Sequence, residues 1–226
     1  MNRPVTTRPA AAGPAPAGRR AARRLATRTA ILDAFDRLLA RGGVAALGVN
    51  ALVKEAGVGK KALYDRFGGL AGVAAAWVRE RTVWQSLESI IGESWEAFRA
   101  RPPADRLLHA HRCYAESLRR NPRLCELLAG EFLHSPEVKG AVDHVRQMVR
   151  ADFDRVLASD PALRRPAFAA LNLVAYAVAT YLGLRAHHQP QFFGFDLSAE
   201  TPWLAVMEMV ERVLRAAGAA AEAEID

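Results

Sequence analysis

Apolar residues recur every three or four positions along most of the chain, and no long stretch alternates apolar and polar residues with a period of two. Such spacing gathers apolar side chains on one face of a helix, whereas a half-buried strand would alternate. Many expected helices start where a capping side chain precedes proline. These dipeptides are Asn121-Pro122, Ser135-Pro136, Asp160-Pro161 and Thr201-Pro202. The pattern predicts an all-α protein.

The same pattern predicts an opening helix near residues 25–41, two short helices within 49–67 and a fourth near 70–81. Longer helices are expected at about 84–100, 104–120, 122–133, 136–158, 162–188 and 202–217. Pro166 offers an alternative start for the helix at 162–188. Residues 189–200 (QPQFFGFDLSAE) break the helical pattern, which predicts a loop. We expect its phenylalanines to be shielded from water.

The longest apolar run covers residues 167–184 and approaches the length that spans a bilayer. Asn172, several alanines and the lack of an aromatic belt favour a buried helix instead. We therefore expect no membrane association.

The stretch 49–67 has the pattern of two short amphipathic helices separated by glycine. In the first (VNALVKEA) the apolar positions are Val49, Leu52, Val53 and Ala56. Gly57 permits the positive φ that ends this helix, and Leu63 and Phe67 lie one turn apart in the second. Two short helices joined by a tight turn predict a helix-turn-helix. The preceding helix supplies an apolar stripe on which the pair can pack, formed by Ile31, Phe35, Leu38 and Leu39.

Positive charge is concentrated at the N-terminal end of the 226-residue chain, whose formal net charge is +7. Residues 1–24 carry six arginines and no acid, residues 25–67 have a net charge of +3, and the remainder has −2. This asymmetry indicates a polyanionic partner on the N-terminal side. The alternative for residues 1–24, which are rich in Pro and Ala, is a merely solubilising tail; in either case we expect a disordered basic arm.

Hydrophobic residues make up 51% of the chain, enough for a packed core. The two cysteines, Cys113 and Cys125, are too few for a disulfide framework and fit a reducing compartment. No signal peptide is visible, so we expect a cytoplasmic protein.

Residues 27–73 (TRTAILDAFDRLLARGGVAALGVNALVKEAGVGKKALYDRFGGLAGV) resemble the DNA-binding domain of the TetR family of transcriptional regulators. The shared features are the opening helix, a glycine-containing loop, Ala56-Gly57-Val58, Leu63-Tyr64 and Phe67. The resemblance implies a helix-turn-helix DNA-binding domain at 25–69. It also implies a larger helical domain at 70–226 that binds a ligand and forms a dimer.

The chain departs from the family pattern at several positions. Gly48 stands where a threonine usually opens the second helix, and Gly59 and Ala62 stand where hydroxyl side chains are common. Leu70 replaces a lysine that often meets the DNA backbone. We expect Lys60, Lys61 and the arginine-rich arm to compensate.

The expected recognition helix buries Leu63 and Phe67, so at roughly 100° per residue Lys61, Ala62 and Asp65 should face the base edges. Lys61 suits guanine, Asp65 suits cytosine N4, and the Ala62 methyl suits the thymine methyl. The alternative is a solvated ion pair between Lys61 and Asp65. The remaining expected DNA-binding residues flank this face or precede it: Lys60, Tyr64, Arg66, Arg23, Arg24, Arg28 and Asn50.

Aromatic side chains on different predicted helices of the second domain can converge on one cavity. They are Trp84, Trp95, Phe98, Tyr114, Phe132, Phe153 and Tyr176. At helical spacing such residues also form plain core. The resemblance implies an inducer pocket among these helices, and apolar walls suit a small, largely apolar molecule.

Two apolar stripes predict a homodimer. The first lies on the long helix and comprises Phe168, Leu171, Ala175, Val178 and Leu182. The second lies on the last helix and comprises Trp203, Val206, Val210 and Val213. We expect both to pack against their symmetry mates.

No motif supports catalysis. A phosphate-binding loop would need a preceding strand, and no nucleophile elbow is present. His109 and Cys113 lie one helical turn apart, with His111 and Cys125 nearby, but a zinc site needs three or four ligands in tetrahedral geometry. We expect no enzymatic activity, cofactor or metal.

The resemblance thus implies a ligand-responsive regulator, a repressor that a small apolar molecule releases from a double-stranded DNA operator. The alternative is a helical protein that keeps the fold but lacks specific operator binding. Such a protein would act through protein contacts or bind nucleic acid nonspecifically. The departures at Gly59, Ala62 and Leu70 motivate this alternative.

Overall fold

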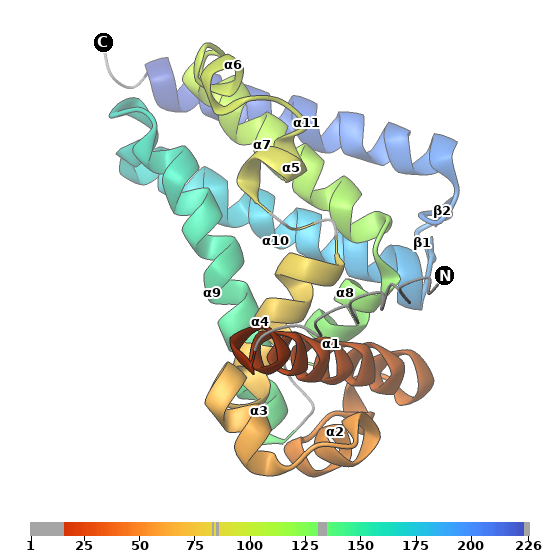
Figure 1. Cartoon of the computed structure of the whole chain (residues 1–226). Coiled ribbons are helices and arrows are strands. Elements are labelled where there is room, and N and C mark those ends of the chain that lie inside the picture. Colours follow the sequence, from red (N-terminus) through yellow and green to blue (C-terminus); the bar gives the residue numbers. More distant parts are fainter. Residues whose placement is uncertain (1–15, 83, 85, 131–134, 224–226) are drawn as a thin grey trace, which may run out of the picture.

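The computed structural model describes residues 16–82, 84, 86–130 and 135–223, and these are almost entirely helical (Figure 1). The lower part of the molecule in Figure 1 holds α1 (Pro16–Gly42), the 3₁₀ turn η1 (Val44–Ala46), α2 (Val49–Ala56) and α3 (Lys60–Phe67). The next helix, α4 (Leu70–Arg81), rises from it into a larger helical domain. The all-α prediction is confirmed.

Two short helices open the larger domain, and four long ones build it. Its elements are α5 (Leu87–Ile91), α6 (Trp95–Arg99), α7 (Pro103–Arg119), α8 (Pro122–Ala129), α9 (Pro136–Ala158), η2 (Ala162–Arg164), α10 (Pro166–His188) and α11 (Glu200–Ala223). A small antiparallel hairpin of β1 (Gln191–Phe192) and β2 (Phe195–Asp196) joins α10 to α11.

The structure corrects the N-terminal boundary, because α1 already begins at Pro16. Residues 16–24, expected in a disordered arm, are therefore helical. Alanine and arginine are both strong helix formers, and the segment continues directly into an amphipathic helix that is already nucleated. Residues 1–15 of the expected arm lie outside the described residues.

Other boundaries differ for local reasons. The helix expected at 84–100 is two helices, because Gly92 ends α5 in the left-handed conformation at φ 71° and Ser94 caps α6. Asn121 and Ser135 cap α8 and α9 as expected. Thr201 lies inside α11 instead of capping it, and Pro166 is the true start of α10. The expected loop at 189–200 contains the hairpin, in which Phe193 remains 89% exposed.

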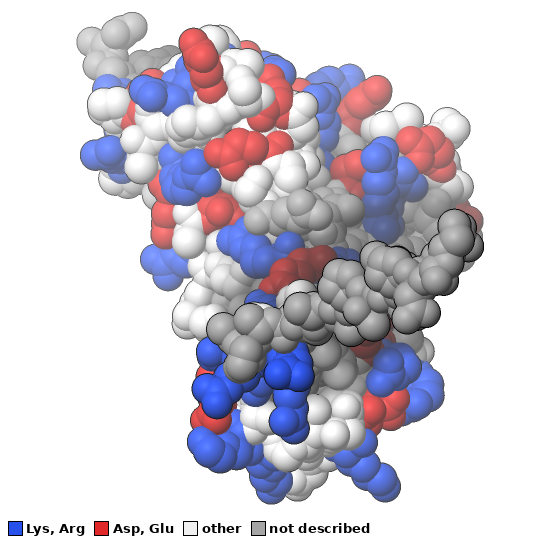
Figure 2. Space-filling view, in the orientation of Figure 1, with Lys and Arg blue, Asp and Glu red and all other residues white. Residues whose placement is uncertain are grey.

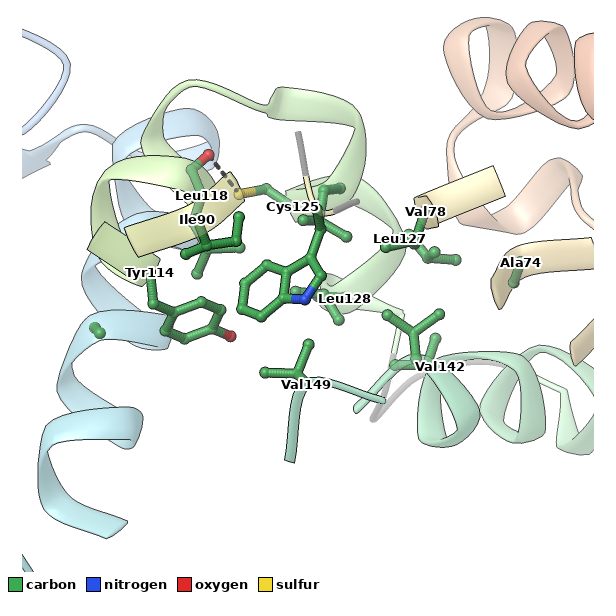
Figure 3. Packing of buried hydrophobic residues seen from close by; sticks show 14 of the residues in the cluster. Ala74, Val78, Ile90, Tyr114, Leu118, Cys125, Leu127, Leu128, Val142 and Val149 are labelled. Atoms are coloured by element: carbon green, nitrogen blue, oxygen red, sulfur yellow. Dashed lines mark hydrogen bonds between the residues drawn. The ribbon is translucent and has the colours of Figure 1, made fainter. Parts of the chain in front are cut away.

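A single apolar core runs through the molecule. Residues of four helices point toward one another in Figure 3: Ala74 and Val78 of α4, Tyr114 and Leu118 of α7, Cys125, Leu127 and Leu128 of α8, and Val142 and Val149 of α9. Gly183 lets α10 approach α7 closely, since a Cβ there would lie 2.7 Å from Leu118 Cβ. A larger residue at this position would therefore force α10 and α7 apart.

The lower domain is attached to the upper one at two places. α4 packs along α9, which is its main partner in the structure. At the second place α8 lies against α1 and η1, where the Val44 N–H donates to Glu126 Oε1 at 3.2 Å and Arg123 pairs with Asp36. α8 and α9 are therefore the helices of the upper domain that contact α1, η1 and α4.

Candidate nucleic-acid interface and effector cavity

The turn between α2 and α3 is built by Gly57. This residue has φ 65° and ψ 33°, and its N–H donates to the Lys54 carbonyl at 3.3 Å. A side chain would strain this left-handed conformation, which explains the glycine. The next N–H, of Val58, returns to the Val53 carbonyl at 3.0 Å, so the turn is closed by two bonds. The helix-turn-helix therefore has a fixed geometry.

α3 buries Leu63 completely and presents most of its polar side chains to solvent. Lys60, Lys61, Tyr64 and Asp65 are all exposed, as the sequence predicted for a DNA-facing helix. The Lys61 ammonium donates to both Asp65 carboxylate oxygens, at 2.9 and 3.1 Å. The alternative ion pair is thus present in the protein without DNA, on side chains that are 87% and 54% exposed.

Three expected DNA-binding residues differ from that arrangement. Arg66 folds back along α3 and its Nη1 donates to the Ala62 carbonyl at 3.1 Å, which leaves both residues half-buried. Arg28 pairs with Glu80 of α4, and its guanidinium lies 4.9 Å from the centroid of the Phe67 ring. In the protein without DNA, Arg28 thus bridges α1, α3 and α4, whereas Arg66 is held along its own helix α3.

The N-terminal extension of α1 adds a strongly basic surface. Arg19, Arg20, Arg23 and Arg24 are all exposed and, at 100° per residue, span one side of the helix. Blue atoms predominate on the lower part of the molecule in Figure 2, whereas both signs of charge are mixed over the upper domain. Asn50, at the start of α2, is also exposed.

An ion-pair cluster that the sequence analysis missed orients α2 on α1. Arg37 Nε and Arg41 Nη2 each donate to the Glu55 carboxylate at 2.8 Å. The hydrogen bonds from Arg41 and then Arg37 lower the pKa of Glu55 below its usual value. Arg37 and Arg41 lie one turn apart on α1, but pairing with an acid 14 to 18 residues away depends on how α2 docks. No local sequence pattern predicts this pairing of Arg37 and Arg41 with Glu55.

A buried carboxylate connects α9 to the end of α4. Asp152 Oδ2 accepts a hydrogen bond from the Trp84 indole N–H at 2.7 Å and from Arg79 Nη1 at 3.3 Å. Asp152 is only 6% exposed. Buried carboxylates need such partners to offset their lost hydration. The three side chains therefore fix the position of α4 relative to α9.

The expected ligand-binding aromatics fall into two groups. Trp84, Tyr114, Phe153 and Tyr176 form one continuous cluster, in which Tyr114 stacks on Tyr176 at 5.3 Å between centroids and meets Trp84 edge-on at 5.2 Å. Trp84 and Tyr114 are almost fully buried in the core, and neither borders the cavities described below. Their mutual packing leaves no room between them, a point that one-dimensional spacing does not reveal.

The second group lies elsewhere. Trp95 stacks on Phe98 at 5.3 Å, within the α6 segment. Phe98 is fully buried there, and Arg155 lies over the Trp95 ring. The remaining residue of the expected set, Phe132, lies outside the described residues.

A cavity of about 540 Å³ opens between α9 and α10, at the edge of the aromatic cluster. Phe153 and Tyr176 are the two expected residues that border it. Its other lining residues are Asp143, Arg146, Gln147, Arg150, Asp154, Leu157, Ala169, Asn172 and Leu173. A second hollow of about 540 Å³ lies among α5, α7 and α11, with Trp203 and Met207 in its wall. Both volumes suit small organic ligands.

The structure corrects most of the expected dimer stripe. Phe168, Leu171, Ala175, Leu182 and Trp203 are each at most 8% exposed within one protomer. α10 and α11 both pack against α7, so these side chains belong to the protomer core. Val178, Val206 and Val210 are half-buried, and Val213 is 60% exposed. Because α10 is apolar on all sides, its sequence pattern does not show which side faces the core of the protomer.

A different set of apolar side chains is left exposed. Among the described residues of the upper domain, all large exposed apolar side chains lie on α10, the hairpin and α11: Leu173, Val174, Tyr181, Phe193, Phe195, Leu204, Met209 and Val213. One described helix, α10, is long and apolar enough to cross a membrane by length and composition alone, yet 39% of its most apolar stretch is buried in the protomer. A core helix passes the same test.

The histidine and cysteine residues have ordinary partners. His109 Nε2 lies 2.9 Å from the Ile91 carbonyl and 3.6 Å from Cys113 Sγ. Cys125 Sγ lies 3.3 Å from the Leu118 carbonyl (Figure 3), and burial raises its pKa to about 12. Within the described residues no group of three or more His, Cys, Asp or Glu could hold a metal ion.

Comparison with known protein families matches residues 31–76 to the family described as bacterial regulatory proteins, tetR family. The match begins in α1, includes α2, the Gly57 turn and α3, and ends within α4. Comparison with curated proteins gave no match. The matched segment is the helix-turn-helix unit whose recognition helix presents lysine and tyrosine side chains to solvent. Residues 31–76 are thus a DNA-binding domain of the tetR type, and this match supports membership of the chain in that family of transcriptional regulators.

Proposed function

We propose that the protein is a homodimeric, ligand-responsive regulator, a repressor that leaves its operator when a small, largely apolar molecule binds in the cavity between α9 and α10. The observation that carries this proposal is the position of that cavity. Phe153 borders it, and the preceding residue on α9, Asp152, holds Trp84 and Arg79 at the end of α4. α4 in turn packs on α3 and α1.

The exposed apolar residues support the dimer. Leu173, Val174, Ala177 and Tyr181 fall within about 100° on one side of α10, with small residues at the centre of the stripe. On the neighbouring α11, Met209 and Val213 lie one turn apart. A monomer would leave these side chains in water, and a second copy offers the same apolar surface in return. We propose this face, and not the stripe expected from the sequence, as the dimer interface.

The test is a titration of the full chain, followed by fluorescence anisotropy, with duplex DNA from upstream of its own gene and with unrelated DNA of equal length. A regulator of this kind binds the first duplex at least 100-fold more tightly, at a stated salt concentration. Equal affinities for the two duplexes would contradict operator binding.

One observation favours the alternative function. Gly59 and Ala62 lack hydroxyls, and Arg28 and Arg66 are engaged by Glu80, Phe67 and the Ala62 carbonyl instead of pointing to solvent. Fewer groups are then available for phosphates and bases. A protein without specific operator binding would select no consensus from a pool of randomised duplexes, whereas a specific regulator would enrich one.

A further inference from the structure

The cavity between α9 and α10 has an apolar wall and a polar wall. Phe153, Leu157, Leu173 and Tyr176 supply rings and aliphatic groups. The polar wall contains Arg146 and Gln147 from α9 and Asn172 from α10. A ligand that fills this space must therefore combine an apolar body with a polar group whose chemistry matches those side chains.

The orientation of Asn172 is set from behind the cavity by His111. The ring of His111 is 3% exposed and stacks on Phe153 at 4.4 Å between centroids, and its Nε2 lies 2.9 Å from Asn172 Oδ1. Burial lowers the pKa of His111 to about 4, so the ring is neutral at pH 7. A neutral ring has one N–H, and Oδ1 can only accept, so Nε2 donates and Nδ1 carries no proton.

With this tautomer, Nδ1 of His111 is a buried acceptor that has no partner among the described residues. The other tautomer would cost more, because the Nδ1 N–H would then lack an acceptor and the Asn172 carbonyl would lack a donor. Because its carbonyl faces His111, Asn172 turns its NH₂ group the other way, toward the cavity that it lines. No described residue accepts a hydrogen bond from that NH₂. Asn172 thus offers donors, and not an acceptor, to a ligand.

Arg146, from α9, places a positive charge on the same polar wall as Asn172. Its Nη1 donates to the Tyr176 hydroxyl at 3.1 Å, which holds the guanidinium beside the aromatic surface. A guanidinium donates only, and it pairs best with planar oxyanions. Arg150, one turn further along α9, is 81% exposed and lies 3.7 Å from Asp154, so this second arginine belongs to the rim.

We propose that the effector of this cavity is a small organic carboxylate, whose anionic group lies between Arg146 and Asn172 and whose apolar body packs against Phe153 and Tyr176. The inference rests on the proposed function and adds the chemical class of the ligand. Donors from α9 and α10 on the polar wall then converge on one oxyanion, and the aromatic surface of the apolar wall receives the rest of the molecule. The cavity acid Asp143 opposes the anion and limits its affinity.

Three probes with one ring system test the charge preference: 2-naphthoate, its neutral amide 2-naphthamide and the cation 2-naphthylmethylammonium. Isothermal titration with the full chain in the absence of DNA should give a dissociation constant for the carboxylate at least tenfold below that of the amide, with the cation weakest. Equal or tighter binding of the amide or the cation overturns the proposal, and so does a lack of binding by all three at millimolar concentration.

Variants locate the site. Asn172→Asp keeps an acceptor for His111 but replaces the donors with negative charge, and Arg146→Gln removes the positive charge. Each should weaken 2-naphthoate at least tenfold and leave 2-naphthamide within threefold. Lys139→Gln, the matched control at an exposed position of α9 outside the cavity lining, should change either affinity less than threefold. Circular dichroism melts establish that each variant is folded, and Arg146→Gln carries the test if Asn172→Asp is not.

Unchanged 2-naphthoate affinity in a folded Arg146→Gln variant, or an equal loss in Lys139→Gln, overturns the assignment of the site. Binding is measured here without DNA, and operator binding is measured without ligand. A failure of the carboxylate preference is therefore distinguishable from a failure of the proposed regulator function.

Discussion

The pair of Lys61 and Asp65 on α3 competes with every contact that either side chain makes to DNA. Both side chains are more than half exposed, and the pair spans one helical turn. Such pairs contribute about 0.3–0.5 kcal/mol, because water screens the charges. A guanine or cytosine edge that offers a better partner can therefore separate them at little cost.

Lys61→Ala is expected to weaken binding to the preferred operator by about 1–3 kcal/mol and to relax the preference at one base pair. Lys54→Ala serves as the matched control, since this exposed lysine lies on α2 and not on the recognition helix. Lys54→Ala should weaken binding to all duplex sequences by the same factor. Selection from randomised duplexes reports both effects, and an unchanged consensus with Lys61→Ala would contradict base reading by this residue.

His111 makes folding dependent on pH. Its pKa is about 4 in the folded protein, against about 6.5 in an unfolded chain, because burial disfavours the imidazolium. Between these values the unfolded chain binds a proton that the folded protein does not. The free energy of unfolding therefore falls as the pH drops from about 6.5 toward 4, by about 3 kcal/mol in full.

Urea unfolding of the wild type and of His111→Gln, followed by circular dichroism, measures this dependence. Glutamine still donates to Asn172 but does not titrate, so the variant should lose less stability than the wild type between pH 7 and pH 5. His144→Gln, an exposed histidine on α9, should behave like the wild type. Parallel pH profiles for wild type and His111→Gln would disprove the effect.

At the scale of elements, the contact between α4 and α9 depends on Asp152. Asp152→Ala removes the acceptor of the buried Trp84 N–H and is expected to destabilise the protein by about 2–4 kcal/mol. Asp152→Asn keeps a carbonyl and should recover part of the loss. Asp154→Ala, an exposed position two residues on, should stay within about 0.5 kcal/mol of the wild type.

Urea denaturation gives these three values directly. If Asp152→Ala were no more destabilising than Asp154→Ala, the link between α9 and α4 would carry little energy. The proposed route from cavity to α3 would then need another element, such as the contact of α8 with α1.

The N-terminal extension of α1, residues 16–24, carries four arginines on a helix. Replacing Arg19, Arg20, Arg23 and Arg24 with glutamine should flatten the dependence of log affinity on log salt by about 0.9 for each phosphate that is no longer neutralised. Glutamine retains helix propensity, so the change isolates charge from structure. Arg212→Gln on α11 is the control. Anisotropy titrations between 50 and 200 mM salt, roughly the range in which counterion release dominates, provide the slopes.

An identical slope in the quadruple variant would show that the extension neutralises no phosphate. Residues 16–24 would then extend α1 without contributing to DNA binding.

For the whole molecule, the proposed dimer interface is the exposed apolar face of α10 and α11. Leu173→Lys combined with Met209→Glu is expected to dissociate the dimer and to reduce operator affinity, because two half-sites are then no longer bound together. Arg212→Glu, an exposed and polar position on α11, should leave the dimer intact. Sedimentation velocity at micromolar concentration distinguishes the species. A monomeric wild type would rule out this interface.

The fold was predictable from local signals. Periodicity marked the helices, Gly57 marked the turn, and the capping residues Asn121 and Ser135 marked two starts correctly. The DNA-binding unit was recognisable because its residues are contiguous, and α3 exposes Lys60, Lys61, Tyr64 and Asp65 as spacing predicts.

The tertiary arrangement of the helices could not be predicted from these local sequence signals. Whether Trp203 faces a neighbour in the same protomer or a second copy depends on where α7 lies. Sequence spacing also could not show that Glu80 lies within reach of Arg28, or that Arg66 folds back onto the Ala62 carbonyl. The cavity was located only by the structure, since Trp84 and Tyr114 fill the space that their positions suggested.

The apolar face of α10 also has a quantitative consequence for gene control. If only the paired form of the protein engages the operator, then at concentrations below the dimer dissociation constant the amount of active species rises with the square of total protein. A twofold fall in cellular copy number would then reduce the active species about fourfold. For the proposed dimer, the protein concentration at which the operator is occupied would therefore depend on Leu173, Val174 and Tyr181 as well as on the residues that touch DNA.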